Sequence, residues 1–341
     1  MLTRLLTTTT IPWRLNSVQR EARTKLYEAV TRGDLLLSKR EACLCGSQDL
    51  TKIASIDRFG LDFSSYLCRD CGLVLTSPYI SEASLARYYS EYYHSLTFGK
   101  NEPLERLFAN AQGRKIFHKL KEYLPPGRIR VLEIGAGVGS NLLDFQDEAS
   151  SSGLDVEALG IEYSQAYVEF GRKKGVELLQ SGLREFGSAT SDRFDVIIMS
   201  HVFEHFTDPA RELATIRKIS RENTLLYIEV PGILHLRRNL AYGSDLLKYL
   251  THAHIFNFSL STLVNVLRAG GFSLLSGNEV VETVFRVDRE LVRNSLGKIQ
   301  TNPANHKQIL GYLADLEENL PTYRRRIFLE RQWRRISRFF A

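Results

Sequence analysis

The sequence lacks long hydrophobic runs and contains few cysteines. No window approaches the roughly 18 apolar residues that a membrane-spanning helix needs, which argues against an integral membrane protein. The chain also shows no charged-then-apolar pattern typical of a secretory signal. Only four cysteines occur among 341 residues, and all of them fall early in the chain. With 43% apolar and 25% charged residues, the composition is that of a folded protein with one large or two modest cores.

Basic charge is concentrated at the two ends of the chain. The formal charge is +6, from 45 basic and 39 acidic residues. Residues 322–341 hold seven Arg and one Glu, and residues 1–40 hold eight bases and three acids, so the body between them is slightly acidic. The first 24 residues, with four Arg and no acid before Glu21, loosely fit a mitochondrial transit peptide, although an ordinary leading arm explains them better. The expected location is therefore cytoplasmic.

The basic C-terminal end has the pattern of an amphipathic helix. From Tyr323, apolar residues recur at spacings of four, three and four, as Leu329, Trp333, Ile336 and Phe340. Such a helix can lie on an acidic membrane, dock on the acidic body or pair with a second subunit. The sequence leaves these alternatives open.

The four cysteines form two close pairs with the spacing of a metal site. Cys43 and Cys45 are separated from Cys68 and Cys71 by 22 residues, and each pair is followed by glycine. Four thiolates in this pattern predict a tetrahedral, structural zinc site with no open position for substrate. The glycines are expected at positive φ, where backbone amides can turn toward the thiolates. Two disulfides are the alternative, which the missing secretory signal disfavours.

After residue 128 the sequence alternates between apolar strands and helices. A strand over 130–134, a loop with three glycines and a helix beginning at Ser140 predict a βα unit. A dinucleotide-binding fingerprint requires its third glycine at position 140, but that residue is serine and the third glycine is Gly139. The loop therefore fits a nicotinamide or flavin cofactor poorly.

The loop instead reads Glu-x-Gly-x-Gly-x-Gly, formed by Glu133, Gly135, Gly137 and Gly139. This pattern resembles the first motif of class I S-adenosylmethionine (SAM)-dependent methyltransferases. The resemblance implies close approach of the loop backbone to SAM, with Glu133 meeting the positive amino-acid end of the cofactor through the loop.

Two further residues are predicted to contact the cofactor. A strand over 156–162 ends in Glu162, 29 residues after Glu133, where an acceptor for two ribose hydroxyls belongs. Leu183 occupies the place where members of the resembling family contact adenine.

The remaining strands complete an α/β fold. They are expected over 176–179, 194–200, 224–230, 272–276 and 280–287, with helices between them. The resemblance implies a Rossmann-like, seven-stranded methyltransferase sheet in which one strand is antiparallel. The predicted fold class is this sheet with an N-terminal four-cysteine zinc-binding module and a C-terminal helical extension.

A polar cluster follows the strand over 194–200 and includes His201, Glu204 and His205. Because ligands of open parallel sheets bind beyond the carboxyl ends of the strands, the cluster is expected at the substrate site. If a helix begins at this point of the chain, the three side chains lie on the same face of it. His-x-x-Glu-His is also the inverzincin motif, but a strand precedes it here and Thr-Asp-Pro follows, so a metalloprotease is rejected. Capping and packing are the alternative role of Glu204 and His205.

His252 and His254 form a second histidine pair, before a helix expected over 259–267. Members of the family often have a histidine at the position of His254. Residues two apart face opposite ways on a strand, so one of the two is expected to point inward. A sugar hydroxyl is a poor nucleophile that needs a base or a metal. The predicted catalytic residues are therefore His201, Glu204, His205 and His254, with no role assigned to each and a divalent metal left open.

A run of tyrosines lies between the cysteines and the glycine loop: Tyr88, Tyr89, Tyr92 and Tyr93. Tyrosine suits the wall of a partly wet pocket, and equally a helix face packed against a neighbouring domain.

The four cysteines, the methyltransferase core and the Glu204-His205 pair together resemble the zinc-containing branch found among sugar methyltransferases of polysaccharide and antibiotic pathways. The resemblance covers about residues 41–287 and implies methyl transfer to a nucleotide-linked or polymer-terminal sugar. Because the chain lacks the long C-terminal domain of carbon-methylating members, oxygen is favoured over carbon. The Glu204-His205 pair also resembles quinone-precursor O-methyltransferases, in which a metal assists.

A protein that binds nucleic acid, such as an RNA methyltransferase or an inactive scaffold, is a further alternative. The acidic body and the absence of a basic stripe interleaved with aromatics near the predicted cleft argue against it. The expected organisation is a basic helical arm (1–40), a four-cysteine module (41–80), a helical linker or substrate cap (81–125), a methyltransferase core (126–287) and a helical basic extension (288–341).

Overall fold

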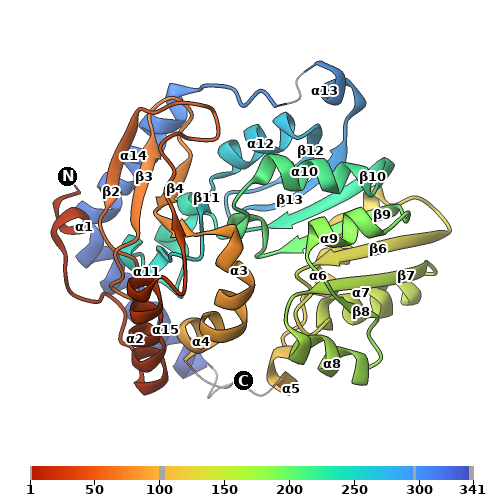
Figure 1. Ribbon diagram of the computed structural model, residues 1–341, viewed down its shortest axis with the longest axis horizontal. Helices are drawn as coiled ribbons and strands as arrows, with labels where there is room; N and C mark the ends of the chain where they lie inside the picture. The colour runs from red at the N-terminus through yellow and green to blue at the C-terminus, as the bar shows by residue number, and fades with distance from the viewer. Residues whose placement is uncertain (1, 100–103, 295–296, 338–341) are drawn as a thin grey trace.

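The computed structural model describes residues 2–99, 104–294 and 297–337. One side of the molecule is a large twisted sheet with helices on both faces, and the other side is a smaller sheet (Figure 1). Helices from the C-terminal part of the chain lie against the smaller sheet (Figure 1).

The large sheet has seven strands. They are β6 (Arg128–Ile134), β7 (Asp155–Glu162), β8 (Leu178–Gln180), β9 (Phe194–Ser200), β10 (Ser220–Glu229), β12 (Phe272–Gly277) and β13 (Glu282–Val287). Their order is β12-β13-β10-β9-β6-β7-β8, and β13 runs antiparallel to both neighbours. All seven expected strands form, and one of them is antiparallel as expected. β13 begins two residues later than predicted because Val281 adopts φ 65°, which lies outside the extended region.

Helices cover both faces of this sheet. On one face lie α6 (Gly113–Leu120), α7 (Ser140–Ser151) and α8 (Gln165–Lys173), and on the other α9 (Leu183–Ala189), α10 (Pro209–Lys218) and α12 (Leu260–Ala269). Asp208 explains where α10 begins, since its side chain accepts a hydrogen bond from the Arg211 N–H and Pro209 occupies the first helical position. Burial on both faces is why the central strands are almost entirely apolar.

The smaller sheet is antiparallel, with the order β11-β4-β3-β2. Its strands are β2 (Leu50–Ala54), β3 (Ser64–Cys68), β4 (Val74–Ser77) and β11 (Phe256–Asn257). Next to it, β1 (Leu37–Ser38) pairs with β5 (Tyr79–Ile80). Because β11 comes from the segment after β10, the four-cysteine region shares backbone hydrogen bonds with the methyltransferase part of the chain.

The N-terminal arm is helical and packs onto the rest of the chain. It contains α1 (Thr3–Thr7) and α2 (Ser17–Arg32). Arg4 forms ion pairs with Asp245 at 2.8 Å and with Glu317 at 2.7 Å, and both carboxylates are buried. These pairs connect the arm to two distant parts of the chain.

A helical segment crosses between the two sheets (Figure 1). It comprises α3 (Glu82–Tyr88), the π-helix η1 (Tyr89–Tyr93), α4 (His94–Phe98), α5 (Leu104–Phe108) and the short η2 (Lys121–Tyr123). Tyr88 and Tyr92 are buried in a cluster with α2, whereas the rings of Tyr89 and Tyr93 lie 6.1 and 6.0 Å from that of His205. The tyrosine run therefore packs against α2, and Tyr89 and Tyr93 also reach the ring of His205.

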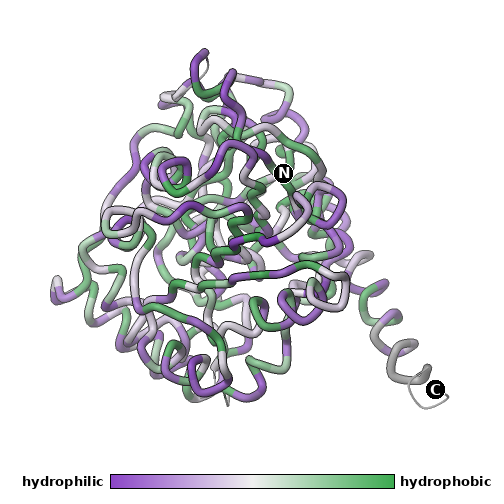
Figure 2. Tube along the Cα trace, turned by 90° about the vertical axis from the view of Figure 1, so that its right-hand side faces the viewer, coloured by the Kyte–Doolittle hydropathy of each residue, from purple (hydrophilic) through white to green (hydrophobic). Residues whose placement is uncertain are grey.

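The other helices are η3 (Phe203–His205), η4 (Ile233–Arg238), α11 (Leu246–Tyr249), α13 (Arg289–Asn294), α14 (Pro303–Glu318) and α15 (Leu320–Ser337). Ile327 buries one side of α15, while Phe328, Leu329 and Trp333 are exposed. Figure 2 shows α15 running away from the body. The predicted apolar residue Phe340 and the side chain of Ile336 lie outside the described residues. Among the described residues, no helix has the length and apolar character to cross a membrane.

Candidate active site

The glycine loop between β6 and α7 turns at the carboxyl ends of two neighbouring strands. Gly135, Gly137 and Gly139 all adopt positive φ, at 67°, 57° and 79°. A Cβ atom on Gly135 would lie 2.6 Å from Val202, and one on Gly139 would lie 2.7 Å from Val176. Gly137 instead faces open space. The outer glycines are therefore required for packing, and the middle one leaves the loop backbone open to a ligand.

Glu162 ends β7 and fixes the loop. Its Oε2 accepts a hydrogen bond from the Gly137 N–H at 3.0 Å, and its Oε1 accepts one from the Ser164 N–H at 2.9 Å. Each carboxylate oxygen retains a further lone pair. Glu162 can therefore hold the loop and still accept hydrogen bonds from sugar hydroxyls.

Glu133 is the second-last residue of β6 and is almost completely buried, with 1% of its surface exposed. Its Oε1 accepts a hydrogen bond from Asn141 at 2.8 Å, whereas its Oε2 has no partner among the described residues. Burial raises the pKa of Glu133 to about 8, and the nearby Glu162 carboxylate adds to the rise although Asn141 opposes it. A buried acid with an unpartnered oxygen is suited to a ligand that brings positive charge.

Leu183 is the first residue of α9 and is 5% exposed, with its side chain in the main core. The structure places it two residues beyond Ser181, whose N–H donates to the Glu162 backbone oxygen at 3.1 Å. Its contact with adenine stays a prediction.

His201 follows β9 at the same edge of the sheet. It adopts φ 57°, unusual for a residue with a side chain, while its N–H donates to the Glu229 backbone oxygen at 2.8 Å. The imidazole is half exposed, with Nδ1 3.7 Å from Glu204 Oε1 and Nε2 3.9 Å from Glu229 Oε1. Desolvation lowers the pKa of His201, but the two carboxylates outweigh it, so the pKa lies above its usual value.

Glu204, His205 and His254 lie together behind His201. The Nε2 atoms of His205 and His254 are 3.8 and 3.9 Å from Glu204 Oε1. The side chains of His201, Glu204 and His205 converge as expected, but they do not share a helix face. Only Glu204 and His205 lie in the 3₁₀ turn, and His201 precedes it with φ 57°. Burial lowers the pKa of His205 and lowers that of His254 well below its usual value, so both rings are neutral near pH 7.

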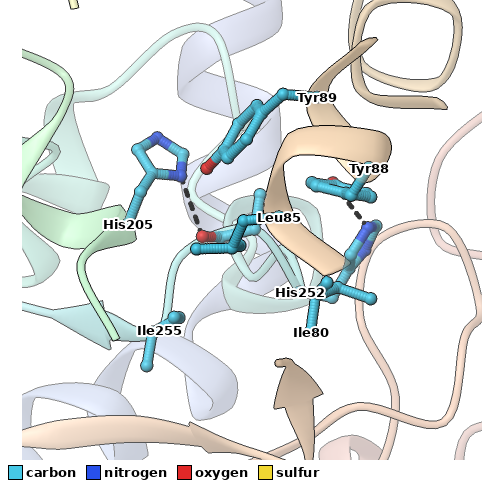
Figure 3. Close-up of a pocket in the computed structure, with 8 residues that line it drawn as sticks. Ile80, Leu85, Tyr88, Tyr89, His205, His252 and Ile255 are labelled. Atoms are coloured by element: carbon cyan, nitrogen blue, oxygen red, sulfur yellow. Dashed lines mark hydrogen bonds between the residues drawn. The ribbon is translucent and has the colours of Figure 1, made fainter. Parts of the chain in front are cut away.

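Tyrosines cover the buried side of this cluster. A small cavity lies beside His205, with Leu85, Tyr88, Tyr89 and Ile255 among its lining residues (Figure 3). Burial raises the pKa of Tyr93 to about 12 and that of Tyr89 well above its usual value, so both phenols stay protonated. Since His205 is enclosed here, the open approach to the cluster is on the side of His201.

His252 has a different role from His254. Its Nδ1 lies 2.7 Å from Asp57 and its Nε2 lies 2.8 Å from the Tyr88 hydroxyl, a bond drawn in Figure 3. The expected strand does not form here, since the two residues lie in a turn before β11. Both side chains are buried, but only His254 points toward Glu204.

The four cysteine sulfurs converge beside the smaller sheet and form no disulfide bonds. Cys43 Sγ lies 3.5 Å from Cys71 Sγ, and Cys45 Sγ lies 3.7 Å from Cys68 Sγ, distances too long for disulfides. The glycines after the pairs, Gly46 and Gly72, have φ 88° and 80° as predicted.

Comparison with known proteins identifies the family of the part of the chain that carries the glycine loop and the His201 cluster. A family model described as "Methyltransferase domain" matches residues 106–276, half of the chain. The chain belongs to this methyltransferase family. It is a SAM-dependent methyltransferase, and the predicted assignment to class I is confirmed.

Solved structures give weaker similarities. The plantazolicin methyltransferase BpumL in complex with SAH is 16% identical, with a TM-score of 0.41 over 53% of this chain and 77% of that chain. A SAM-dependent methyltransferase from Aquifex aeolicus is 17% identical, with a TM-score of 0.40 over 54% and 94% of the two chains. One from Archaeoglobus fulgidus is 22% identical, with a TM-score of 0.36 over 50% and 72%. No match is found among curated proteins.

Two polar residues at this edge escaped prediction from the sequence. Glu229 ends β10 beside His201, and the Lys115 Nζ lies 3.3 Å from its carboxylate. Glu229 could have been found by its position, because it lies at the carboxyl end of a predicted strand, one residue before its last, as Glu133 does. Lys115 comes from α6, whose approach to this edge no local pattern indicates.

SAM binding should release a proton from Glu133. With a pKa of about 8 the carboxyl is mostly protonated at lower pH, whereas the positive amino-acid end of SAM favours the ionised form. The affinity for SAM should therefore rise with pH, by up to about tenfold per unit below pH 8, and then level off. Calorimetry in buffers of different ionisation enthalpy measures this proton, and Glu133→Gln should not release it. Equal proton release by both proteins would contradict the role of Glu133.

Proposed function

We propose that the protein transfers the methyl group of SAM to a sugar hydroxyl, on a nucleotide sugar or a polysaccharide intermediate. The observation that carries this proposal is the half-exposed imidazole of His201, set between two carboxylates next to the glycine loop. A sugar hydroxyl is a poor nucleophile, so its methylation calls for such a base. The resemblance of the four-cysteine and Glu204-His205 pattern to sugar methyltransferases supports the same acceptor class.

The cofactor half of the site comprises Glu133, the glycine loop and Glu162. When bound, SAM supplies a methyl group activated by a positively charged sulfur. Glu162 is placed to accept hydrogen bonds from the ribose, and the open face at Gly137 lets the loop backbone approach. Glu133, with its unpartnered Oε2, balances the positive amino-acid end. Alignment of cofactor and acceptor supplies most of the rate enhancement.

His201 acts as the general base of the acceptor half. As the acceptor oxygen gains the methyl group, the bond from that carbon to the sulfur of SAM would break and the sulfur would leave as a neutral thioether. The proton of the acceptor oxygen would pass to the imidazole of His201. The carboxylates of Glu204 and Glu229, within 3.9 Å of the ring nitrogens, stabilise the imidazolium that forms.

His201→Ala should separate turnover from cofactor affinity. Loss of a general base lowers turnover by about 100-fold or more, while the dissociation constant for SAM should change less than about twofold. His118→Ala is the matched control, because His118 is a half-exposed histidine on α6 that pairs with Glu148. Steady-state kinetics and calorimetry give the two quantities. An equal loss of turnover and affinity would mean that His201 has an architectural role.

The identity of the methylated atom in the product distinguishes O-methylation from C-methylation. With ¹³C-methyl SAM and a nucleotide-sugar acceptor, the product should show the NMR resonance of a methoxy carbon. A resonance of a methyl group attached to carbon would overturn O-methylation.

We also propose that the four cysteines hold a structural zinc ion. With Zn–S bonds of about 2.3 Å, a tetrahedron has S···S edges of about 3.8 Å, close to the 3.5 and 3.7 Å found here. Backbone N–H groups of Ser47 and Leu73 donate to the sulfurs of Cys45 and Cys71, as expected for thiolates. Four protein ligands leave no position for substrate, so the ion would stabilise the fold.

We further propose that α15 contacts an anionic membrane surface. Its exposed Phe328, Leu329 and Trp333 stand beside basic residues such as the exposed Arg325, the pattern of an interfacial helix. Such contact fits an enzyme that acts on lipid-linked glycans.

Trp333→Glu should reduce pelleting with vesicles of anionic phospholipid by about tenfold, because it places a carboxylate at the membrane face. Gln332→Glu, at the exposed neighbouring position, is the control for added charge and should retain most of the binding. Equal pelleting of wild type and Trp333→Glu would overturn the membrane proposal. A wild-type dimer that Trp333→Glu dissociates would assign α15 to a second subunit instead.

A further inference from the structure

We propose that Glu204, His205 and His254 bind a divalent metal ion, at a site separate from the four cysteines. One carboxylate oxygen and one nitrogen from each ring lie within 4.8 Å of one another. The side chains come from two segments, the turn after β9 and the turn before β11, and the Ile255 N–H donates to the Glu204 backbone oxygen at 2.9 Å, which joins them.

The buried carboxylate of Glu204 is the first argument. Glu204 is 1% exposed, and neither of its side-chain oxygens has a hydrogen-bond partner among the described residues. Burying a carboxylate that accepts no hydrogen bond costs several kcal/mol. The histidine nitrogens at 3.7 to 3.9 Å are too distant to be hydrogen-bond donors to it. A cation between the carboxylate and the rings would satisfy the charge.

The orientation of His205 is the second argument. Its Nδ1 lies 2.8 Å from the Ala253 carbonyl oxygen and must donate to it, as drawn in Figure 3. The lone pair of the neutral ring is therefore on Nε2, the atom that faces Glu204. A bond from the second ring nitrogen to a backbone carbonyl is the usual support of a histidine that ligates a metal.

The distances between the ligand atoms fit a bound metal ion if these atoms move slightly closer together. Ligand atoms around a tetrahedral ion with bonds of about 2.1 Å lie about 3.4 Å apart, so the 3.8 and 3.9 Å found here need to close by a few tenths of an ångström. Two imidazoles and one carboxylate suit zinc, manganese or iron better than magnesium, which prefers oxygen ligands. Three protein ligands leave open positions, in contrast to the cysteine site.

The open positions face the acceptor side of the site. His201 Nδ1 lies 3.7 Å from the same Glu204 oxygen and is half exposed, whereas Tyr89 and Tyr93 enclose the opposite side at His205. A bound divalent ion lowers the pKa of a hydroxyl that it coordinates. In this arrangement His201 is placed to take the proton of that hydroxyl.

The test is the zinc content of the full-length chain after loading with Zn²⁺ and removal of weakly held metal by a mild chelator. Glu204→Gln and His205→Asn should each retain one zinc fewer per chain than wild type, since loss of a ligand should weaken binding by at least about 100-fold. The amide of Asn can still donate to the Ala253 carbonyl, so His205→Asn keeps the local hydrogen bond. Glu229→Gln, a second carboxylate within 4 Å of His201, is the matched control and should retain the wild-type zinc content.

SAM binding by the same samples verifies that the variants are folded. Equal zinc content in wild type and in a folded Glu204→Gln or His205→Asn variant would overturn the proposal, because the ion would then lie elsewhere or not bind at all. Loss of zinc from Glu229→Gln as well would also overturn it, because the effect would not be specific to the three ligands.

Discussion

Gly137→Arg should abolish SAM binding and leave the protein folded. Gly137 faces open space in the loop, and its N–H donates to Glu162, the predicted ribose acceptor. An arginine side chain would occupy the space into which the cofactor must come, and its positive charge would oppose that of SAM. The affinity should fall by at least about 100-fold, measured by calorimetry, because the side chain excludes the ligand rather than removing one contact.

Gly153→Arg separates this effect from backbone strain. Gly153 has φ 79° and, like Gly137, no atom within 4 Å of the point where a Cβ would lie, but it sits in the turn after α7, away from the strand ends. Both variants should lose about 1 kcal/mol of stability, from placing a side-chain residue in the left-handed region. Full SAM affinity in Gly137→Arg would contradict the assignment of the loop.

Cys68→Ser should remove the structural zinc and lower the melting temperature by at least about 10 °C. Cys68 is fully buried at the end of β3, in the same core cluster as the helices beneath the large sheet. Structural zinc contributes on the order of 10 kcal/mol of binding free energy, and a loss of even 3 to 5 kcal/mol moves the melting temperature of a chain of this size by about 10 °C. Calorimetry and elemental analysis measure the two effects.

Arg69→Ala provides the control for Cys68→Ser. Arg69 is the next residue, is exposed, and its side chain pairs with surface groups, Asp49 and Thr51. The variant should keep its zinc and change the melting temperature by less than about 2 °C. Wild-type protein that holds no zinc at the cysteines, or Cys68→Ser with unchanged stability, would contradict a structural metal.

The sequence predicts the large sheet well because its signals are local. Each parallel strand is an apolar run bounded by turn residues, and covering helices on both faces keep that run apolar. The acids Glu133 and Glu162 are found for the same reason, since each lies at the carboxyl end of such a run. The Cys-Gly pairs also predict correctly where positive φ is needed.

What the sequence cannot predict depends on distant segments. β11 adds to the sheet of the cysteine region although nearly 180 residues separate it from β4, and only tertiary packing places it there. His252 and His254 lie in a turn rather than the expected strand, because the spacing of two histidines does not by itself distinguish a turn from a strand. Glu229 and Lys115 meet His201 and Glu282 through the register of the sheet and the docking of α6.

Product mass spectrometry tests the central claim most directly. The protein is incubated with SAM and a panel of nucleotide sugars, glycan acceptors and catechols, and each acceptor is examined for the added mass of one methylene group. The account predicts that a sugar acceptor gains this mass and that the gain falls by about 100-fold in His201→Ala. Methylation of catechols alone, with every sugar unchanged, would contradict it.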